Sequence, residues 1–350
     1  MKIITFYTFL IIYLFHFDVS VCTSQTNTDF YIDLREVEMI PVFDRDLSYS
    51  YIEIIQPVHD HYVVIHDPPE GASVINRKGE LQFRLDASGR GPFEIQRPRY
   101  VAYENQKVFI WDSGNLKFLV FDEDIGPDVE LLGIRHAIDG FDVNKNGLVA
   151  VFQNPRFQDQ YVHIYEINDS NRLAKRKDLG NLTNEGRTLF FMDNTGGVLW
   201  NENDLVWVEP SKTILNIYSI DKEEQIEIQF DEQLFEVRPS PIRADQDFNR
   251  NSFDDIKAYI KNNSRILSIR KLTEHIIVEM EHFEDEESII TYAIFDLDYN
   301  HLGRIELEES GWTNYIRGVD GNRLFYWGEN YVNTGVINHI RVREITVERK

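Results

Sequence analysis

Cysteine is almost absent from this chain, because its 350 residues include only Cys22. A single thiol forms no intrachain disulfide and builds no cysteine-based zinc or iron–sulfur site. Basic residues are also scarce beside acidic ones, with 36 Lys and Arg against 59 Asp and Glu and a formal net charge of -23. Nucleic acids and anionic membrane surfaces attract clustered Lys and Arg, so this balance argues against either as a partner.

Long helical periodicity is equally scarce, and short strands take its place. Apolar residues make up 42% and charged residues 27%, which is a globular composition. Short β-branched and aromatic runs recur between Asp, Asn and Gly, as at 62–65, 107–111, 147–152 and 324–327. This pattern favours a sandwich, a barrel or a propeller. The exception lies at 252–262, where apolar residues three to four apart predict one small helical insertion near 250–262.

A longer repeat decides between these all-β architectures. One strand type, an apolar pair followed by a polar turn, recurs along the chain with most gaps close to 45 residues. Its aligned apolar positions are Ile75, Val120, Ile164, Ile217, Ile294 and Ile340. A repeat of about 45 residues suits a four-stranded propeller blade. The widest gap contains the insertion at 231–265, so six copies predict a single six-bladed β-propeller over 29–350.

The chain ends predict how the ring closes. After the sixth copy only residues 344–350 remain, too few for a full outer hairpin. An extra alternating strand at 30–37 precedes the first blade. We expect this N-terminal strand to pair with the last blade, because the pairing would leave neither end of the chain as an open edge.

The first 22 residues resemble a secretory signal peptide. Lys2 precedes an apolar stretch at 3–17, and Asp18 ends that stretch short of the roughly 20 residues that span a membrane. We therefore expect export, to the periplasm or to an outer-membrane-anchored position at the cell surface. Cys22 stands where a lipoprotein signal places its acylated cysteine, before a polar tether at 23–28, and a lipid there would be the only membrane contact. The alternatives are an ordinary cut near 20–24, since Val21 is larger than the usual small residue, or a retained anchor helix.

The segment 88–94, Ser-Gly-Arg-Gly-Pro-Phe-Glu, carries a family resemblance. It resembles the G-x-G-P-x-E signature of six-bladed β-propeller lipoproteins of Bacteroidota-type bacteria, relatives of NHL and TolB-like propellers. Residues 39–42, Met-Ile-Pro-Val, are similar to the opening I-P-L motif of that family. Phe93 departs from the pattern, because the family usually has glycine after the proline. The resemblance covers the chain from about residue 29 and implies fold and compartment far more than activity.

Two short segments supply candidate ligand-binding residues. The stretch 89–94 has no Lys-Ser/Thr and no strand-to-helix context, so an inter-blade turn explains it better than a phosphate cradle. Arg90 and Glu94 remain ligand-binding candidates, because inter-blade loops gather around the central channel. His59 and His61 flank a strand-connecting turn and are the second candidate pair.

Signals for metal and catalysis are weaker. Residues 142–147 match the opening of a calcium loop, but position 153 is Gln rather than Glu, so a hairpin turn is favoured. The acidic run 279–287 is interpreted as a solvated hairpin tip. No H-E-x-x-H or G-x-S-x-G motif occurs, so no catalytic residue and no cofactor is predicted, with calcium kept open. The 23 Phe, 17 Tyr and 5 Trp are assigned mainly to blade interfaces rather than sugar-stacking platforms.

Two functions stay open at this stage. The favoured one is a non-enzymatic binding or interaction module at the cell envelope, a monomer whose ligand is a glycan, a peptide or an envelope protein. The alternative is a metal-dependent hydrolase of the lactonase or esterase kind, with calcium in the central channel. Carboxylate and amide oxygens converging at a channel mouth would favour the hydrolase. A channel lined by aromatic residues and arginine would favour binding.

Overall fold

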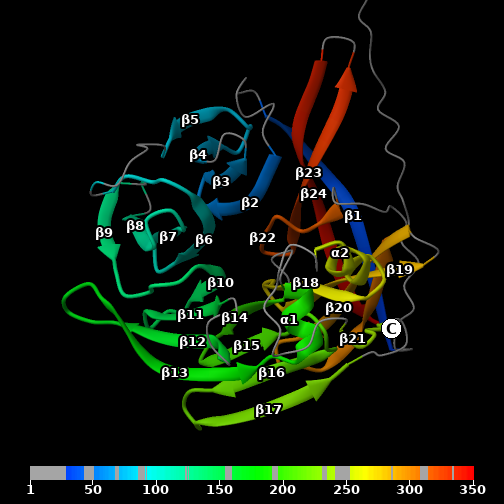
Figure 1. Ribbon diagram of the computed structural model, residues 1–350. Helices are drawn as coiled ribbons and strands as arrows, with labels where there is room; N and C mark the ends of the chain where they lie inside the picture. Colours follow the sequence, from blue (N-terminus) through cyan, green and yellow to red (C-terminus); the bar gives the residue numbers. More distant parts are fainter. Residues whose placement is uncertain are drawn as a thin grey trace, which may run out of the picture.

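The computed structural model is a six-bladed β-propeller (Figure 1). It describes residues 29–42, 51–67, 71–85, 91, 93–122, 124, 126–153, 160–190, 196–230, 235–240, 253–284, 287–307, 314–332 and 335–350. The signal, the tether, Cys22 and Arg90 lie outside these residues. Every sheet has four strands, and neighbouring strands in each sheet are antiparallel.

The first three blades follow one another along the chain. The first holds β2 (Tyr51–Val58), β3 (His61–Asp67), β4 (Gly71–Asn76) and β5 (Leu81–Arg84). The second holds β6 (Pro98–Glu104), β7 (Lys107–Asp112), β8 (Lys117–Asp122) and β9 (Pro127–Leu131). The third holds β10 (Ile138–Val143), β11 (Leu148–Gln153), β12 (Gln160–Ile167) and β13 (Leu173–Asn181).

The last three blades complete the ring. The fourth holds β14 (Gly197–Asn201), β15 (Asp204–Val208), β16 (Ile214–Ser219) and β17 (Glu224–Gln229). The fifth holds β18 (Arg265–Lys271), β19 (His275–Glu284), β20 (Glu287–Asp296) and β21 (His301–Leu307). The sixth holds β22 (Gly318–Asp320), β23 (Arg323–Val332), β24 (Gly335–Arg349) and, as its outermost strand, β1 (Phe30–Pro41).

The predicted closure of the ring is confirmed. β1 pairs antiparallel with β24, from Phe30 opposite Arg349 to Pro41 opposite His339. The two ends of the chain therefore share one blade, and Figure 1 shows β1 alongside β24. Because the N-terminal strand pairs with β24, the last blade has four strands like the others, and the edge of β24 is covered.

The repeat that revealed the blades corresponds to the third strand of each one. Its six apolar positions fall in β4, β8, β12, β16, β20 and β24, and all six side chains are buried. Alternation buries these side chains between neighbouring blades, where the largest aromatic residues also pack. Trp111, Trp207 and Trp327 are fully buried there, as the sequence predicts for aromatic residues.

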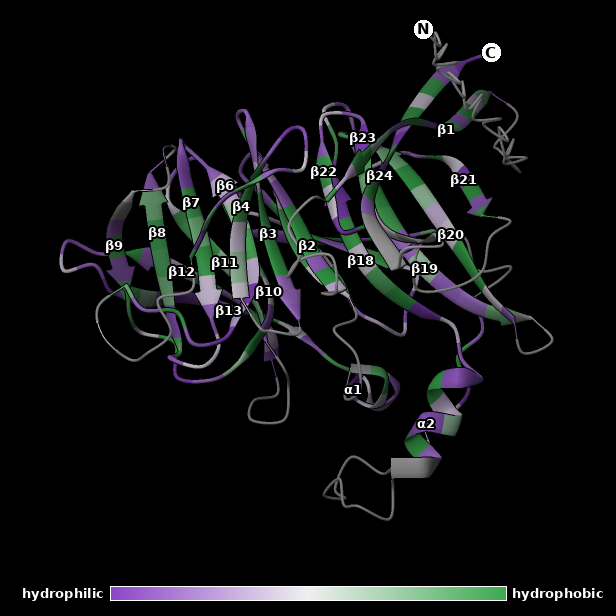
Figure 2. Ribbon diagram, turned by 90° about the horizontal axis from the view of Figure 1, so that it is seen from above, coloured by the Kyte–Doolittle hydropathy of each residue, from purple (hydrophilic) through white to green (hydrophobic). Residues whose placement is uncertain are grey.

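Two helices interrupt the strands in the part of the chain that the structure describes, and Figure 2 shows both on one side of the ring. α2 (Phe253–Lys261) confirms the predicted helical insertion, whereas α1 (Asn184–Phe190) was not predicted. Each helix precedes the first strand of a blade, so this side is the end where first strands begin. Leu189 of α1 packs with Ile256 and Ile260 of α2. Neither described helix is long and apolar enough to cross a membrane.

Candidate functional site

A cavity of about 560 Å³ occupies the centre of the ring. Residues of the first strands of all six blades, β2, β6, β10, β14, β18 and β22, line it together with the residues just before β14 and β22. Figure 1 shows these six strands surrounding the middle of the molecule. We call this cavity the central channel.

A recurring irregularity brings polar side chains to the channel. In four of the six first strands, pairing with the second strand skips one residue close to where the strand begins, which is the pattern of a β-bulge. The skipped residues are Glu53, Arg99, Asp139 and Leu267, and all four line the channel. A bulge changes the direction of its side chain, so one backbone device repeated around the ring supplies three charged groups.

Two of the arginines that line the channel, Arg99 and Arg265, are held by carboxylates. Nη1 of Arg99 lies 3.1 and 3.2 Å from the two carboxylate oxygens of Glu53, which links the first and second blades. Nε and Nη2 of Arg265 each lie 2.6 Å from one Glu281 oxygen. The other oxygen of Glu281 accepts from Ser288 and Tyr315 at 2.5 and 2.9 Å. These contacts hold the side chains in place before any ligand arrives.

Arg317, just before β22, is held between aromatic rings. Its guanidinium carbon lies 4.7 Å from the ring centre of Tyr51 and 5.5 Å from that of Tyr315. Its guanidinium also donates a hydrogen bond to the Tyr51 hydroxyl. Burial lowers the pKa of Arg317 to about 10, yet the group keeps its charge at neutral pH. The channel therefore presents a cation stacked on flat apolar faces.

Glu279 of β19 is the buried acid of the channel. One oxygen accepts the Ile316 backbone N–H at 2.9 Å, and the other accepts the Ser268 hydroxyl at 2.7 Å. Burial raises the pKa of Glu279 to about 7, against the opposing effects of these hydrogen bonds and of Arg270. Near neutral pH this carboxyl is therefore only partly ionised.

The acidic run 279–287 departs from the sequence-based interpretation. Glu279, Glu281 and His282 are buried, so the first part of the run lies inside the molecule rather than at a solvated tip. The hairpin pairing reaches Glu284 opposite Glu287. The interpretation was wrong for this first part, because a basic partner, Arg265, allows the Glu281 carboxylate to be buried, whereas Glu287 at the far side of the hairpin is exposed.

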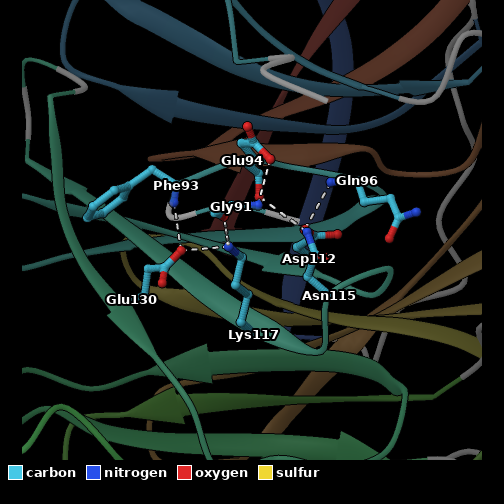
Figure 3. A network of polar contacts seen from close by, with 8 residues as sticks. All are labelled: Gly91, Phe93, Glu94, Gln96, Asp112, Asn115, Lys117 and Glu130. Atoms are coloured by element: carbon cyan, nitrogen blue, oxygen red, sulfur yellow. Dashed lines mark hydrogen bonds and ion pairs between the residues drawn. The ribbon is translucent and has the colours of Figure 1, made fainter. Parts of the chain in front are cut away.

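Gly91, Phe93 and Glu94 lie in the predicted inter-blade turn, where the Glu94 N–H donates to the Gly91 carbonyl at 3.2 Å (Figure 3). A Glu94 carboxylate oxygen accepts the Gly91 N–H at 2.5 Å, and Glu130 accepts the Phe93 N–H at 2.6 Å. Lys117 donates to the Gly91 carbonyl at 3.0 Å and to Glu130 at 2.6 Å. The Glu94 side chain thus has a turn-stabilising contact, and its role in ligand binding stays a prediction. Arg90 falls outside the described residues.

Asp112, at the end of β7, anchors the chain that follows this turn. Its carboxylate accepts the backbone N–H groups of Gln96, Arg97 and Gly114 at 2.9, 2.7 and 3.1 Å. It also accepts from the Asn115 amide at 2.7 Å. These contacts, partly drawn in Figure 3, fix the entry into β6 and so help to place Arg99 in the channel.

The two candidate histidines flank the turn between β2 and β3. Nε2 of His59 lies 2.8 Å from the Tyr103 hydroxyl, and the His59 carbonyl accepts from Arg77 Nε at 3.0 Å. His61 begins β3, opposite Val58 in the sheet. Neither histidine is among the residues that line the channel, and neither is Glu94, so the structure does not bring these candidates together with the channel charges. Their role as ligand contacts remains a prediction.

The calcium-loop match behaves as the favoured hairpin turn. Oδ1 of Asn144 accepts the N–H groups of Asn146 and Leu148 at 3.0 and 2.9 Å, and Gly147 has a φ of 77°. Asp142 accepts the Val143 N–H at 2.9 Å and the Trp200 N–H at 2.8 Å. Its oxygens therefore join the third blade to the fourth. Among the described residues, no group of three or more His, Cys, Asp or Glu side chains is placed to hold a metal ion.

Sequence reasoning did not find the channel residues. Glu53, Arg99 and Asp139 each follow the first or second residue of a first strand. The skipped residue breaks the alternation there, so alternation alone does not predict which way these side chains point. One sequence signal could have found these residues. In three successive blades, a charged residue directly follows Ile52, Pro98 or Ile138 near the start of the first strand.

Comparison with known proteins gives the fold. No family model matches the chain, and neither does any curated protein. A putative exported protein from Bacteroides fragilis matches with a TM-score of 0.60 at 10% identity, over 92% of this chain and 97% of that one. A member of the DUF4221 family from Bacteroides vulgatus matches with a TM-score of 0.62 at 8% identity, over 91% and 99%. The RRP9 WD40 repeats match with a TM-score of 0.50 at 8% identity, over 93% and 100%. At such identities the shared property is the β-propeller fold.

Proposed function

We propose that this protein is an exported cell-envelope propeller that binds its ligand or partner in the central channel. The observation that carries the proposal is the set of bulged first strands, which direct Glu53, Arg99 and Asp139 into one cavity. Its volume of about 560 Å³ lies in the range of small-molecule sites. Glycans, peptides and segments of envelope proteins are the ligand classes considered.

Export is the second part of the proposal. The support is the apolar stretch at 3–17 behind Lys2, together with the fold shared with a putative exported protein from Bacteroides fragilis. Acylation of Cys22 would tether the propeller to a membrane by lipid alone. Palmitate labelling of the wild-type chain and of Cys22→Ala tests the anchor. Label on the wild type alone supports acylation at Cys22, and equal labelling refutes it.

The channel chemistry favours binding over metal-dependent hydrolysis. Glu53 and Glu281 are bonded to arginine, and Glu279 accepts hydrogen bonds from Ile316 and Ser268. A calcium site needs several oxygens free to converge on one point. Glu53, Glu279 and Glu281 are instead held in separate contacts, and the lining combines arginine with tyrosine.

One combined experiment tests this choice. The purified full chain is analysed for bound metal and assayed against a panel of lactones and phosphoesters. In parallel, soluble glycans and peptides are screened for an increase in melting temperature. Ligand-induced stabilisation without turnover is expected. Stoichiometric calcium together with turnover would contradict the binding proposal and support the hydrolase.

A further inference from the structure

We propose that the central channel recognises a small ligand by its carboxylate group, held by Arg270 and Arg317. This inference rests on the proposed function, because it assigns a chemical class to the ligand of the same channel. It follows from the arginines that line the cavity, from the state of the acids that face them, and from the tyrosine rings beside them.

Cations are concentrated in the channel of an acidic protein. The chain carries a net charge of -23, yet the charged side chains lining the cavity are Arg99, Arg265, Arg270, Arg317, Glu53, Asp139 and Glu279. Two of the arginines have carboxylate partners at hydrogen-bonding distance, Glu53 for Arg99 and Glu281 for Arg265. Arg270 is considered for a ligand because its buried Nε has no hydrogen-bond partner among the described residues, and Arg317 because its guanidinium lies against tyrosine rings in the same cavity.

Arg270 acts across the channel. Arg270 belongs to β18 of the fifth blade. Tyr100 belongs to β6 of the second blade, on the opposite side of the ring, and the charge of Arg270 acts to lower the pKa of its hydroxyl. Nε of Arg270 is buried and has no hydrogen-bond partner among the described residues. Burial lowers the pKa of Arg270, which means that its charged form lacks full compensation.

The acids that face Arg270 compensate it only in part. The charges of Glu279 and Asp142 act to raise the pKa of Arg270, and the charge of Glu281 in turn raises the pKa of Glu279. Burial raises the pKa of Glu279 to about 7 and that of Asp142 to about 6. Their oxygens already accept hydrogen bonds from Ile316, Ser268, Val143 and Trp200. An incoming carboxylate would add the negative charge that the buried guanidinium lacks.

Arg317 supplies the second cation and the tyrosines supply flat faces. The rings of Tyr51 and Tyr315 hold its guanidinium, which has the planar arrangement of N–H groups that matches a carboxylate. Tyrosine faces also pack against the carbon skeleton of a ligand. The channel thus combines charge recognition with apolar contact, as small-molecule sites do.

Calorimetric titration of the full chain with matched probes tests the inference. The carboxylates are galacturonate and succinate, and their neutral counterparts are galactose and succinamide. We expect each carboxylate to bind at least tenfold more tightly than its counterpart. Arg270→Gln should weaken carboxylate binding at least tenfold. Arg270→Lys, which keeps the charge and loses the planar pair of N–H donors, should weaken carboxylate binding less. Arg35→Gln, an exposed control on β1, should leave binding unchanged.

Stability separates a binding role from a structural one. With no ligand present, Arg270→Gln should melt at or above the wild-type temperature, because it removes a buried cation that is incompletely compensated. A lower melting temperature with unchanged carboxylate affinity would show that Arg270 is structural and overturn the inference.

The probes also separate this inference from the proposed function. Equal affinity for galactose and galacturonate would overturn the carboxylate inference while the channel remains a binding site. Binding of inorganic phosphate or galactose 6-phosphate without binding of either carboxylate would assign phosphate instead, and the inference would be wrong. Galacturonate turnover with bound calcium would contradict the proposed function itself.

Discussion

The backbone N–H of Lys350 donates a hydrogen bond to the carbonyl of Asp29 at 2.8 Å, so the last residue of the chain meets the start of the propeller. This contact begins the pairing of β1 with β24. Ile32 and Leu34 of β1 are buried in the core shared by the fifth and sixth blades. The N-terminal strand therefore completes the hydrophobic core as well as a sheet edge.

Removal of this closure should destabilise the whole ring. Ile32→Ala and Leu34→Ala should each lower the free energy of unfolding by about 2–4 kcal/mol, because each leaves a cavity in the core. Met39→Ala, at an exposed position of the same strand, should cost less than about 1 kcal/mol. Urea unfolding measures all three. Deletion of residues 29–40 should abolish cooperative unfolding, and a deletion variant that melts like the parent would refute the closure.

Phe93 occupies a backbone conformation that suits glycine. Its φ is 57°, which lies in the left-handed region, and this is the position where the resembling family usually has glycine. Phe93→Gly and Phe93→Ala both remove the ring from the core of the first two blades. The glycine variant should nevertheless be more stable than the alanine variant by about 1 kcal/mol.

The comparison of these two variants isolates the backbone term, because the lost ring contacts are the same. At an ordinary strand position alanine is the more stable of the two. A thermal unfolding series that ranks Phe93→Ala above Phe93→Gly would contradict the strained conformation.

The stability of the protein should depend on pH through Glu279. Burial raises the pKa of Glu279 to about 7, above its ordinary value of 4.5. The folded state therefore binds this proton more tightly than the unfolded state, and the resulting stability is lost as pH rises from about 4.5 through 7. Between pH 5 and 8, the wild type should lose up to about 3 kcal/mol relative to Glu279→Gln.

Urea unfolding of both chains at pH 5, 6, 7 and 8 measures this difference. Burial also raises the pKa of Asp142, to about 6, and adds a slope of the same sign. Asp142 is present in both chains, so the difference between them reports Glu279. Parallel stability curves would show that Glu279 titrates in the same way in the folded and unfolded states.

The fold was predictable from the sequence because each blade repeats one local signal. Ile75 and its five counterparts occupy the third strand of every blade, and residues 30–37 carry the alternation of the closing strand. α1 was missed, since seven residues give too little periodicity to recognise.

The site was less predictable because it depends on pairing between strands. Arg99 enters the channel through a skipped residue in the β6–β7 register, which composition and spacing do not reveal. Glu279 and Glu281 look like a surface run until the register places Arg265 opposite Glu281. Arg270 and Tyr100 lie far apart in sequence and line the same channel only when the ring closes.

The central claim is that the ligand occupies the channel, and a channel-filling variant tests it most directly. Val319 of β22 lines the cavity, whereas Val37 lies exposed on β1, the outermost strand of the same blade. Calorimetry should show that Val319→Trp weakens galacturonate binding at least tenfold, while Val37→Trp binds as the wild type does. Equal affinity of Val319→Trp and the wild type would place the ligand outside the channel and contradict the account.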